Sequence, residues 1–204
     1  MRKTTIIISI MLCFGMTHFS CKTAKNASCV QVIQNSPATS VLPASEMNVI
    51  KSLFNNNRMD YANYQFYQLD KDDLGFHHVR CYQFVNNLRV FSADLIFHFN
   101  QNNTFYLVSG NQIKSIKLDD KPSLNRKKVV ELFVQKLSQE KASMVDKDIV
   151  KGCFEIELGY AALDDSNGKF AKVWQAKPAG RDYPYAYIND DNSEVIYYDS
   201  GVRY

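Results

Sequence analysis

Residues 74–111, LGFHHVRCYQFVNNLRVFSADLIFHFNQNNTFYLVSGN, decide the fold, because they predict three strands joined by two short turns. Alternation of apolar and polar residues over the second strand is typical of a strand with one buried face. The apolar positions there are Phe91, Ala93, Leu95, Phe97 and Phe99, and Ser92, Asp94 and His98 fall on the other face. The pair Asn86-Asn87 and the polar residues 100–103 favour turns, so we expect an antiparallel meander.

The first of these strands carries several polar side chains. In an extended strand, His78 and Arg80 lie on one face and Gln83 on the other, so a bulge would be needed to gather all three into one cluster. We expect His78 and Arg80 to hold the sheet and its loops through hydrogen bonds, with Asp94 on the neighbouring strand as a candidate acceptor. The alternative is that His78, Arg80, Gln83 and Asp94 mark a surface that contacts a protease.

The pattern His78-x-Arg80-x-x-Gln83, followed by NLRVF at 87–91 and VSGN at 108–111, resembles the propeptide domain of fungalysin- and thermolysin-type metalloproteases. This resemblance covers roughly residues 61–111. The remainder is similar to the PepSY domain that usually follows, with a helix from about Ser123 and strands in 171–175 and 185–198. The resemblance implies an α+β fold of two small subdomains, each an antiparallel sheet packed against a helix. The predicted domains are 46–115, like the protease propeptide, and 116–204, like PepSY.

Local patterns place the remaining elements. Helical spacing of apolar residues predicts helices over 46–54 and about 123–141, the second with Ser123 as its N-cap, and a strand is predicted over 64–69. Residues 154–160 alternate apolar side chains with Glu155 and Glu157, which predicts a strand with one wet face. The run DDSNG at 164–168 predicts a turn. A calcium loop is the alternative, but the later bidentate glutamate of such loops is missing.

The amino terminus predicts export. Arg2 and Lys3 precede an apolar run over 6–16, which is short for a membrane span and suits a secretory signal, so residues 1–20 are predicted to be a signal peptide. Ser20-Cys21 resembles the lipobox of bacterial lipoproteins, although His18 stands where leucine is usual. We expect Cys21 to carry lipid and residues 21–45 to form a tether, in which a short strand near Val30 is possible. An ordinary cleaved signal with an unused Cys21 is the alternative. The predicted location is the bacterial cell envelope, most simply the outer membrane.

Three cysteines remain after Cys13 and Cys21 are set aside. They are Cys29, Cys81 and Cys153, so at least one stays free even if an exported chain forms a disulfide. A Cys/His nucleophile pair of Cys81 with His78 is conceivable. Residues three apart in a strand point to opposite faces, and Cys81 shares its face with Val79 and Gln83, so a core thiol is the better interpretation.

Several functions are disfavoured by the sequence. A zinc protease needs His-Glu-x-x-His on a helix, and the chain has no such pattern, so neither a catalytic residue nor a metal or other cofactor is predicted. The net charge of +3 falls to +1 without Arg2 and Lys3, and residues 126–128 form only one basic helical turn. Nucleic acid is therefore not an expected partner.

These inferences lead to two hypotheses about function. The first is a propeptide-like envelope module without an enzyme, which binds a secreted or envelope peptidase in trans and inhibits it or assists its folding. The tyrosine-rich carboxyl-terminal strands would suit such an interface, although aromatic residues are favoured in any strand. The second is a non-inhibitory envelope binding or assembly module that reuses the propeptide fold. A resemblance in fold alone does not decide between them.

Overall fold

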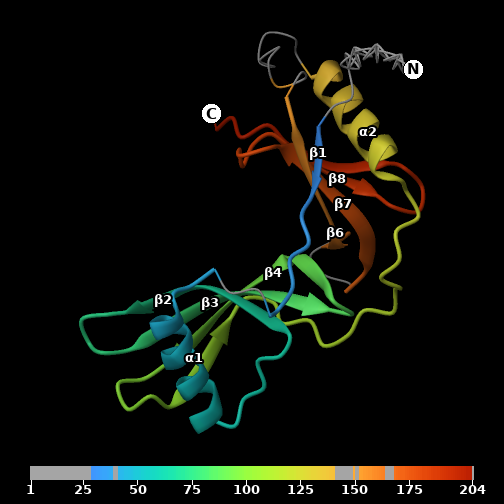
Figure 1. Cartoon of the computed structure of the whole chain (residues 1–204). Coiled ribbons are helices and arrows are strands. Elements are labelled where there is room, and N and C mark those ends of the chain that lie inside the picture. Colours follow the sequence, from blue (N-terminus) through green and yellow to red (C-terminus); the bar gives the residue numbers. More distant parts are fainter. Residues whose placement is uncertain (1–28, 39–40, 141–148, 150–151, 164–167, 204) are drawn as a thin grey trace, which may run out of the picture.

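A computed structural model describes residues 29–38, 41–140, 149, 152–163 and 168–203 (Figure 1). The helices are α1 (Ala44–Asn56) and α2 (Arg126–Gln139). The strands are β1 (Val30–Val32), β2 (Tyr64–Lys71), β3 (His77–Val85), β4 (Leu88–Phe99), β5 (Phe105–Ser109), β6 (Phe154–Ala162), β7 (Phe170–Pro178), β8 (Tyr185–Asn189) and β9 (Val195–Asp199). The predicted helices and strands are all present in the described residues, and most extend a little further than expected.

The nine strands of the described residues belong to one sheet. Its order is β2-β3-β4-β6-β7-β8-β9, with β5 paired to β4 and β1 paired to β6. The α+β class is confirmed, but the prediction of two separate sheets is wrong. Strand β4 has twelve residues and pairs with three strands. Both of its ends pair with β3, its carboxyl-terminal end also pairs with β5, and Arg89 and Val90 pair in parallel with Gly159 and Tyr160 of β6. The pairing with β6 joins the two halves of the sheet.

The first half is the meander of β2 to β5 with α1 packed against it (Figure 1). Its core contains Ile50, Leu53 and Phe54 of α1 together with the inward residues of the strands. Asn86 and Asn87 have φ values of 50° and 63°, the left-handed conformation that a tight hairpin turn requires, as predicted. The core is rich in rings, and the Phe54 ring lies 5.0 Å from that of Phe97 and 5.1 Å from that of Phe66.

The predicted alternation along β4 breaks near its start. The register passes from Tyr82 opposite Asp94 to Phe84 opposite Arg89, so β4 bulges between these pairs. Phe91 consequently leaves the face of Ala93, and its ring stacks on Tyr187 with centroids 5.2 Å apart. The prediction that Phe91 shares a buried face with Ala93 is therefore wrong, because a bulge shifts the side-chain alternation of a strand.

The second half consists of β6 to β9, with α2 beside it in Figure 1. Helix α2 buries Val129, Val130, Phe133 and Leu137 in a cluster that includes Trp174. Its N-cap is Asn125, which accepts a hydrogen bond from the Lys128 N–H at 2.9 Å, and not Ser123 as predicted. The helix therefore begins later than expected, because the backbone of Ser123 is bound elsewhere.

Glu157 was predicted to lie on a solvent-exposed face of its strand. This prediction is wrong, because only 7% of the residue is exposed. Residues 33–35 lie over it after β1 ends, and Asn35 Nδ2 donates to Glu157 Oε1 at 2.8 Å. Strand β1 itself pairs in parallel with β6, and Cys29 forms a disulfide with Cys153. The part of the predicted 21–45 tether from Cys29 to Ile33 is thus built into the sheet. Cys81 is the free cysteine among the described residues and is buried, as expected for a core thiol.

The signal segment 1–20, the lipidation residue Cys21 and residues 164–167 of the predicted turn lie outside the described residues. Within the described part of the chain, neither helix has the length and apolar character needed to cross a bilayer.

Gly159 allows the two halves to meet. A Cβ atom at this position would lie 2.6 Å from the carbonyl oxygen of Arg89 and would overlap the Phe91 ring. We expect Gly159→Ala to lower the free energy of unfolding by about 1–3 kcal/mol, because β4 has to shift away from β6. Urea denaturation measures this, with Ala162→Ser in the same strand as a control expected to change stability by less than about 0.5 kcal/mol. Equal stability of the Gly159→Ala variant and the wild type would contradict this account of the junction.

Candidate partner-binding site

A groove of about 920 Å³ opens where the two halves of the sheet meet. Strand β1 ends at Val32, opposite Ile156, whereas β4 joins the same edge of β6 only at Gly159. The groove lies at the interval between these two pairings. Its lining residues are Val32, Ile33, Gln34, Asn35, Ser36, Asn87, Leu88, Arg89, Pro122, Leu124, Asn125, Arg126, Lys127, Glu157, Leu158 and Trp174.

Local sequence features shape the walls of this groove. The β3–β4 turn at Asn86-Asn87 aims the start of β4 at the edge of β6. Asn125 caps α2, so the amino terminus of that helix and its first two side chains, Arg126 and Lys127, stand at the groove. A helix amino terminus carries partial positive charge and favours anions. The first turn of α2 has no acidic residue.

Arg89 and Glu157 form the polar centre of the groove. The nearest ion-pair contact joins Arg89 Nη1 to Glu157 Oε2 at 3.7 Å, with 19% and 9% of the two side chains exposed. Burial raises the pKa of Glu157, and Arg89, Asn35 and Lys177 act against this rise. The Arg89 guanidinium also lies 3.5 Å from the centre of the Tyr82 ring, a cation–π contact.

Arg89 has hydrogen-bonding capacity left over. Its buried Nε has no hydrogen-bond partner among the residues that the structure describes, and its contact with Glu157 is long. A guanidinium has five donors arranged as a fork that suits carboxylates. Together with Arg126, Lys127 and the helix terminus, Arg89 gives the groove positive charge that favours carboxylate groups.

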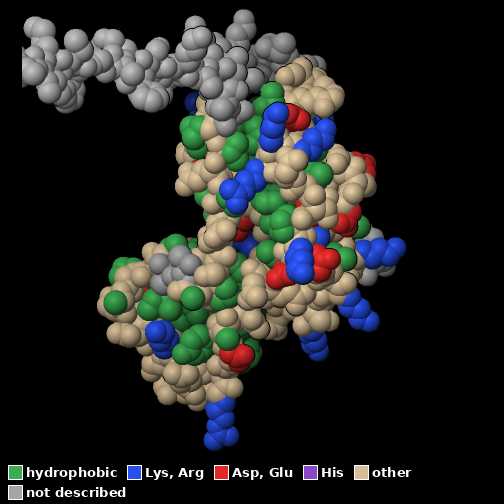
Figure 2. Space-filling view, turned by 45° about the vertical axis from the view of Figure 1, so that its right-hand side comes forward, with side chains coloured by type: hydrophobic (Ala, Val, Ile, Leu, Met, Phe, Trp, Pro, Cys, Tyr) green, Lys and Arg blue, Asp and Glu red, His purple; other side chains and the backbone are tan. Residues whose placement is uncertain are grey.

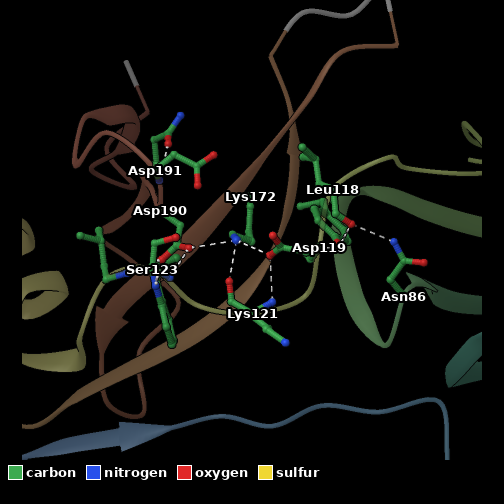
Figure 3. A network of polar contacts seen from close by, with 12 residues as sticks. Asn86, Leu118, Asp119, Lys121, Ser123, Lys172, Asp190 and Asp191 are labelled. Atoms are coloured by element: carbon green, nitrogen blue, oxygen red, sulfur yellow. Dashed lines mark hydrogen bonds and ion pairs between the residues drawn. The ribbon is translucent and has the colours of Figure 1, made fainter.

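A buried network fixes the segment that forms one wall of the groove (Figure 3). Asp190 is fully buried and accepts hydrogen bonds from the Ser123 and Leu124 N–H groups, at 2.7 and 2.9 Å, and from the Trp174 indole at 2.8 Å. Lys172 Nζ lies 3.4 Å from Asp190 Oδ2 and 2.7 Å from Asp119 Oδ1. This network holds the crossing segment between β5 and α2, including Pro122 and Leu124 of the groove.

Further contacts tie the same segment to both halves of the sheet. Asn86 Nδ2 donates to the carbonyl oxygens of Ile116 and Leu118, each at 3.1 Å, as Figure 3 shows in part. The Tyr160 hydroxyl donates to the carbonyl oxygens of Leu118 and Asp119 at 3.2 and 3.0 Å. The groove is therefore bounded by backbone that is hydrogen-bonded in place, which lowers the ordering cost of binding.

A line of aromatic rings continues from Arg89 across the sheet. Tyr185 and Tyr187 alternate with Ala186 and Ile188, which pack in the cluster under α2, so the tyrosines lie on the opposite face. The Arg89 guanidinium links the stacked rings of Tyr67 and Tyr82 to Phe91, and ring contacts continue through Tyr187 to Tyr185, which contacts both Tyr183 and Tyr197. Tyr183 and Tyr197 are 42% and 46% exposed, so the end of this line is open to a partner.

The side chains of His78, Gln83 and Asp94 have different partners in the structure. His78 contacts His98 and Asp72, whereas Asp94 accepts a hydrogen bond from the Tyr67 hydroxyl at 2.7 Å. Within the described residues, no hydrogen bond joins Asp94 to His78 or Arg80. Gln83 is buried on the α1 side, as its position in the strand predicted, and its side chain exchanges two hydrogen bonds with the backbone of Ile113 at 2.6 and 2.9 Å.

Sequence reasoning missed the residues that build the groove. Asn35, Arg89 and Glu157 were not predicted to form a site, because they come together only through the pairing of β6 with β1 and β4. For the network behind the groove wall, one available signal was Lys172, a charged residue with two apolar residues on each side in β7. On the face that Figure 2 shows, basic and acidic side chains are interspersed, so charge alone does not mark the groove.

A comparison with protein-family profiles matches the strands β2 to β5. Residues 62–112 match the profile of the Fungalysin/Thermolysin Propeptide Motif, which covers about a quarter of the sequence. The chain therefore carries the propeptide motif of these proteases over β2 to β5, as the resemblance at His78, Arg80 and Gln83 indicated. No curated protein matches the sequence.

Among solved structures, the Bacillus megaterium YpeB C-terminal domain is similar at 9% sequence identity and a TM-score of 0.38. The match covers 82% of this chain and 69% of that one. A similarity at this level carries no argument about function, and the PepSY-like character of residues 116–204 stays a prediction.

Proposed function

We propose that this chain is a non-enzymatic, propeptide-like regulatory module that binds a secreted or envelope peptidase in trans, and that it inhibits this peptidase or assists its folding. The observation that carries the proposal is the protease propeptide motif at residues 62–112. We further propose that the module is exported by residues 1–20 and held on the outer membrane by lipid on Cys21. The multiple acyl chains of a lipoprotein would make this attachment stable.

The groove supports the proposal, because it offers a place for a segment of the peptidase. It has room for an extended peptide, and its fixed walls would bind one with little ordering cost. Arg89, Arg126, Lys127 and the α2 terminus favour a segment that carries carboxylates. We therefore place the contact with the peptidase at this groove, with the exposed tyrosines as a second contact area.

A second candidate function is a non-inhibitory envelope binding or assembly module. The open line of aromatic rings that ends at Tyr183 and Tyr197 favours it, because a broad aromatic surface can bind a partner without entering an active site. The two functions differ in one result, which is whether a peptidase loses activity when the module binds.

The test is a titration of the full chain, carrying Cys21→Ser to prevent lipidation, into the secreted and envelope peptidases of the source organism. Cys29 has to be retained, since it forms a disulfide within the fold. We expect a saturable, near-stoichiometric change in the activity or refolding yield of one peptidase. Binding without any such change would favour the assembly module, and no binding at micromolar excess would overturn the peptidase proposal.

The groove itself is tested by charge reversal at its exposed rim. We expect the double substitution Arg126→Glu and Lys127→Glu to weaken peptidase binding by about tenfold or more, because like charges repel across an interface. Lys114→Glu with Lys117→Glu is the matched control, since it changes the net charge equally at exposed positions outside the groove. If both double variants weakened peptidase binding equally, the effect would be one of general charge. That result would argue against the groove as the binding site.

A further inference from the structure

Two imidazoles meet on the face of the first half that is turned away from α1. His78 of β3 and His98 of β4 lie directly opposite each other in the antiparallel register. Their Nδ1 atoms are 2.8 Å apart, and the two rings are steeply inclined, with an angle of 73° between their planes. Both residues are partly buried, so the pair is accessible from solvent and is held by the sheet beneath it.

Each imidazole has a polar partner at its other nitrogen. His78 Nε2 lies 3.3 Å from Asp72 Oδ2, and His98 Nε2 lies 2.9 Å from Ser109 Oγ. The Asp72 carboxylate is itself held, because its Oδ1 accepts hydrogen bonds from the Leu74 and Phe76 N–H groups at 3.0 and 2.9 Å. Metal-binding histidines usually donate their second ring N–H to a carboxylate or another oxygen in this way.

Asp72 and Ser109 engage the outer nitrogen of each ring. The hydrogen bond from the Phe76 N–H, together with those from His78 and Leu74, lowers the pKa of Asp72. Because Nε2 of His78 and Nε2 of His98 are engaged in this way, the two Nδ1 atoms face each other. An imidazole nitrogen without a proton is the form that binds metals.

The distance between the two Nδ1 atoms is close to the ligand spacing of one metal coordination geometry. With metal–nitrogen bonds of about 2.0 Å, two ligands at the right angle of a tetragonal site are about 2.8 Å apart, whereas those of a tetrahedral site are about 3.3 Å apart. The 2.8 Å between the Nδ1 atoms is the length of their hydrogen bond in the metal-free pair. It equals the nitrogen spacing of the tetragonal arrangement, so binding in that geometry would need less movement of the rings than a tetrahedral one. Tetragonal nitrogen and oxygen sites favour Cu(II) or Ni(II), and Cu(II) binds most tightly among the first-row divalent ions.

We propose that His78 and His98 form a Cu(II)-binding site through their two Nδ1 atoms, with Asp72 and Ser109 orienting the rings. Copper takes the place of the proton that lies between the Nδ1 atoms in the metal-free pair. That proton moves to His98 Nε2 and is donated to Ser109 Oγ. Within the described chain, no group of three or more His, Cys, Asp or Glu side chains is placed to hold a metal. The remaining coordination positions of the copper are therefore open to water or to a ligand from a bound molecule.

The test is equilibrium dialysis of the full chain carrying Cys21→Ser against Cu(II) ions, after treatment with a chelator. We expect one bound Cu(II) per chain, with an electron paramagnetic resonance spectrum showing two coordinated nitrogens. His78→Asn and His98→Asn should each lower the affinity by about tenfold or more, and Asp72→Asn by about tenfold, as is usual for loss of an orienting partner. His77→Asn is the matched control, because His77 adjoins His78 on the same strand but takes no part in the pair.

The proposal is overturned if the wild type binds no more Cu(II) than the His78→Asn/His98→Asn double variant. It is also overturned if the bound copper shows no imidazole nitrogen. Circular dichroism establishes that each variant is folded. If a variant does not fold, the site is located instead by nuclear magnetic resonance of the wild-type protein during addition of Cu(II). Paramagnetic Cu(II) should broaden the ring signals of His78 and His98 at the lowest additions, and broadening centred on other residues would refute the site.

Discussion

Replacing Asp190 with alanine is expected to lower the free energy of unfolding by about 3–5 kcal/mol, the range found when one member of a buried ion pair is removed. The change leaves the Ser123, Leu124 and Trp174 N–H groups without their acceptor and leaves Lys172 with only Asp119 and a backbone carbonyl. Urea denaturation measures the loss. Asp191→Ala is the control, because this neighbouring residue is exposed and should change stability by less than about 0.5 kcal/mol.

The same residue gives the protein an acid-sensitive stability. Burial alone would raise the pKa of Asp190, but the N–H groups of Leu124, Ser123 and Trp174 and the charge of Lys172 lower it below its usual value. A carboxyl group with a lowered pKa in the folded state stabilises the fold above its unfolded pKa of about 3.9, and this contribution is lost as the pH falls through the folded pKa. The acid branch of a stability–pH curve should therefore be shallower for Asp190→Asn than for the wild type. An unchanged acid branch would mean that Asp190 does not titrate as described.

The network also matters for the proposed function. It fixes the segment that carries Pro122 and Leu124, which line the groove. We expect Asp190→Ala to weaken any binding at the groove even at temperatures where the variant is still folded, because the wall would become mobile. The position of this one carboxylate thus links the stability of the second half to the shape of the junction.

Loss of the Cys29–Cys153 disulfide is expected to lower the free energy of unfolding by about 2–5 kcal/mol. The bond closes a sequence separation of 124 residues, and the chain-entropy model gives large effects for such long loops. It also anchors β1 where this short strand meets β6. Guanidinium denaturation of Cys29→Ser/Cys153→Ser should show the loss, and so should denaturation of the wild type with dithiothreitol.

The double variant provides its own control, because dithiothreitol should not destabilise it further. Cys81 gives an independent readout of the same transition. Burial raises the pKa of its thiol, so Cys81 should react with thiol reagents only once the first half unfolds. If reduction leaves the unfolding midpoint of the wild type unchanged, the disulfide has no structural role.

The amino-acid sequence by itself determined the local structure of this protein. The apolar alternation around Leu95 and Phe97 specified a strand with one buried face, and helical spacing of Ile50 and Phe54 specified α1. The pair Asn86-Asn87 specified the tight turn, because asparagine tolerates the left-handed conformation. The propeptide motif around His78, Arg80 and Gln83 was also readable in the sequence, and the profile match over residues 62–112 confirms it. These signals span a few residues each, so they need no knowledge of the rest of the chain.

Only the tertiary structure decided how the halves are joined. Three features depend on which strands become neighbours and in which register. They are the parallel pairing of Arg89 with Gly159, the burial of Glu157 under residues 33–35, and the contact of His78 with His98. Strand periodicity determines which face a side chain takes, but it does not name the partner strand. Partners separated by many residues are chosen by packing and chain closure across the whole fold, which no local pattern records. For that reason the groove and the histidine pair appear only in the folded protein.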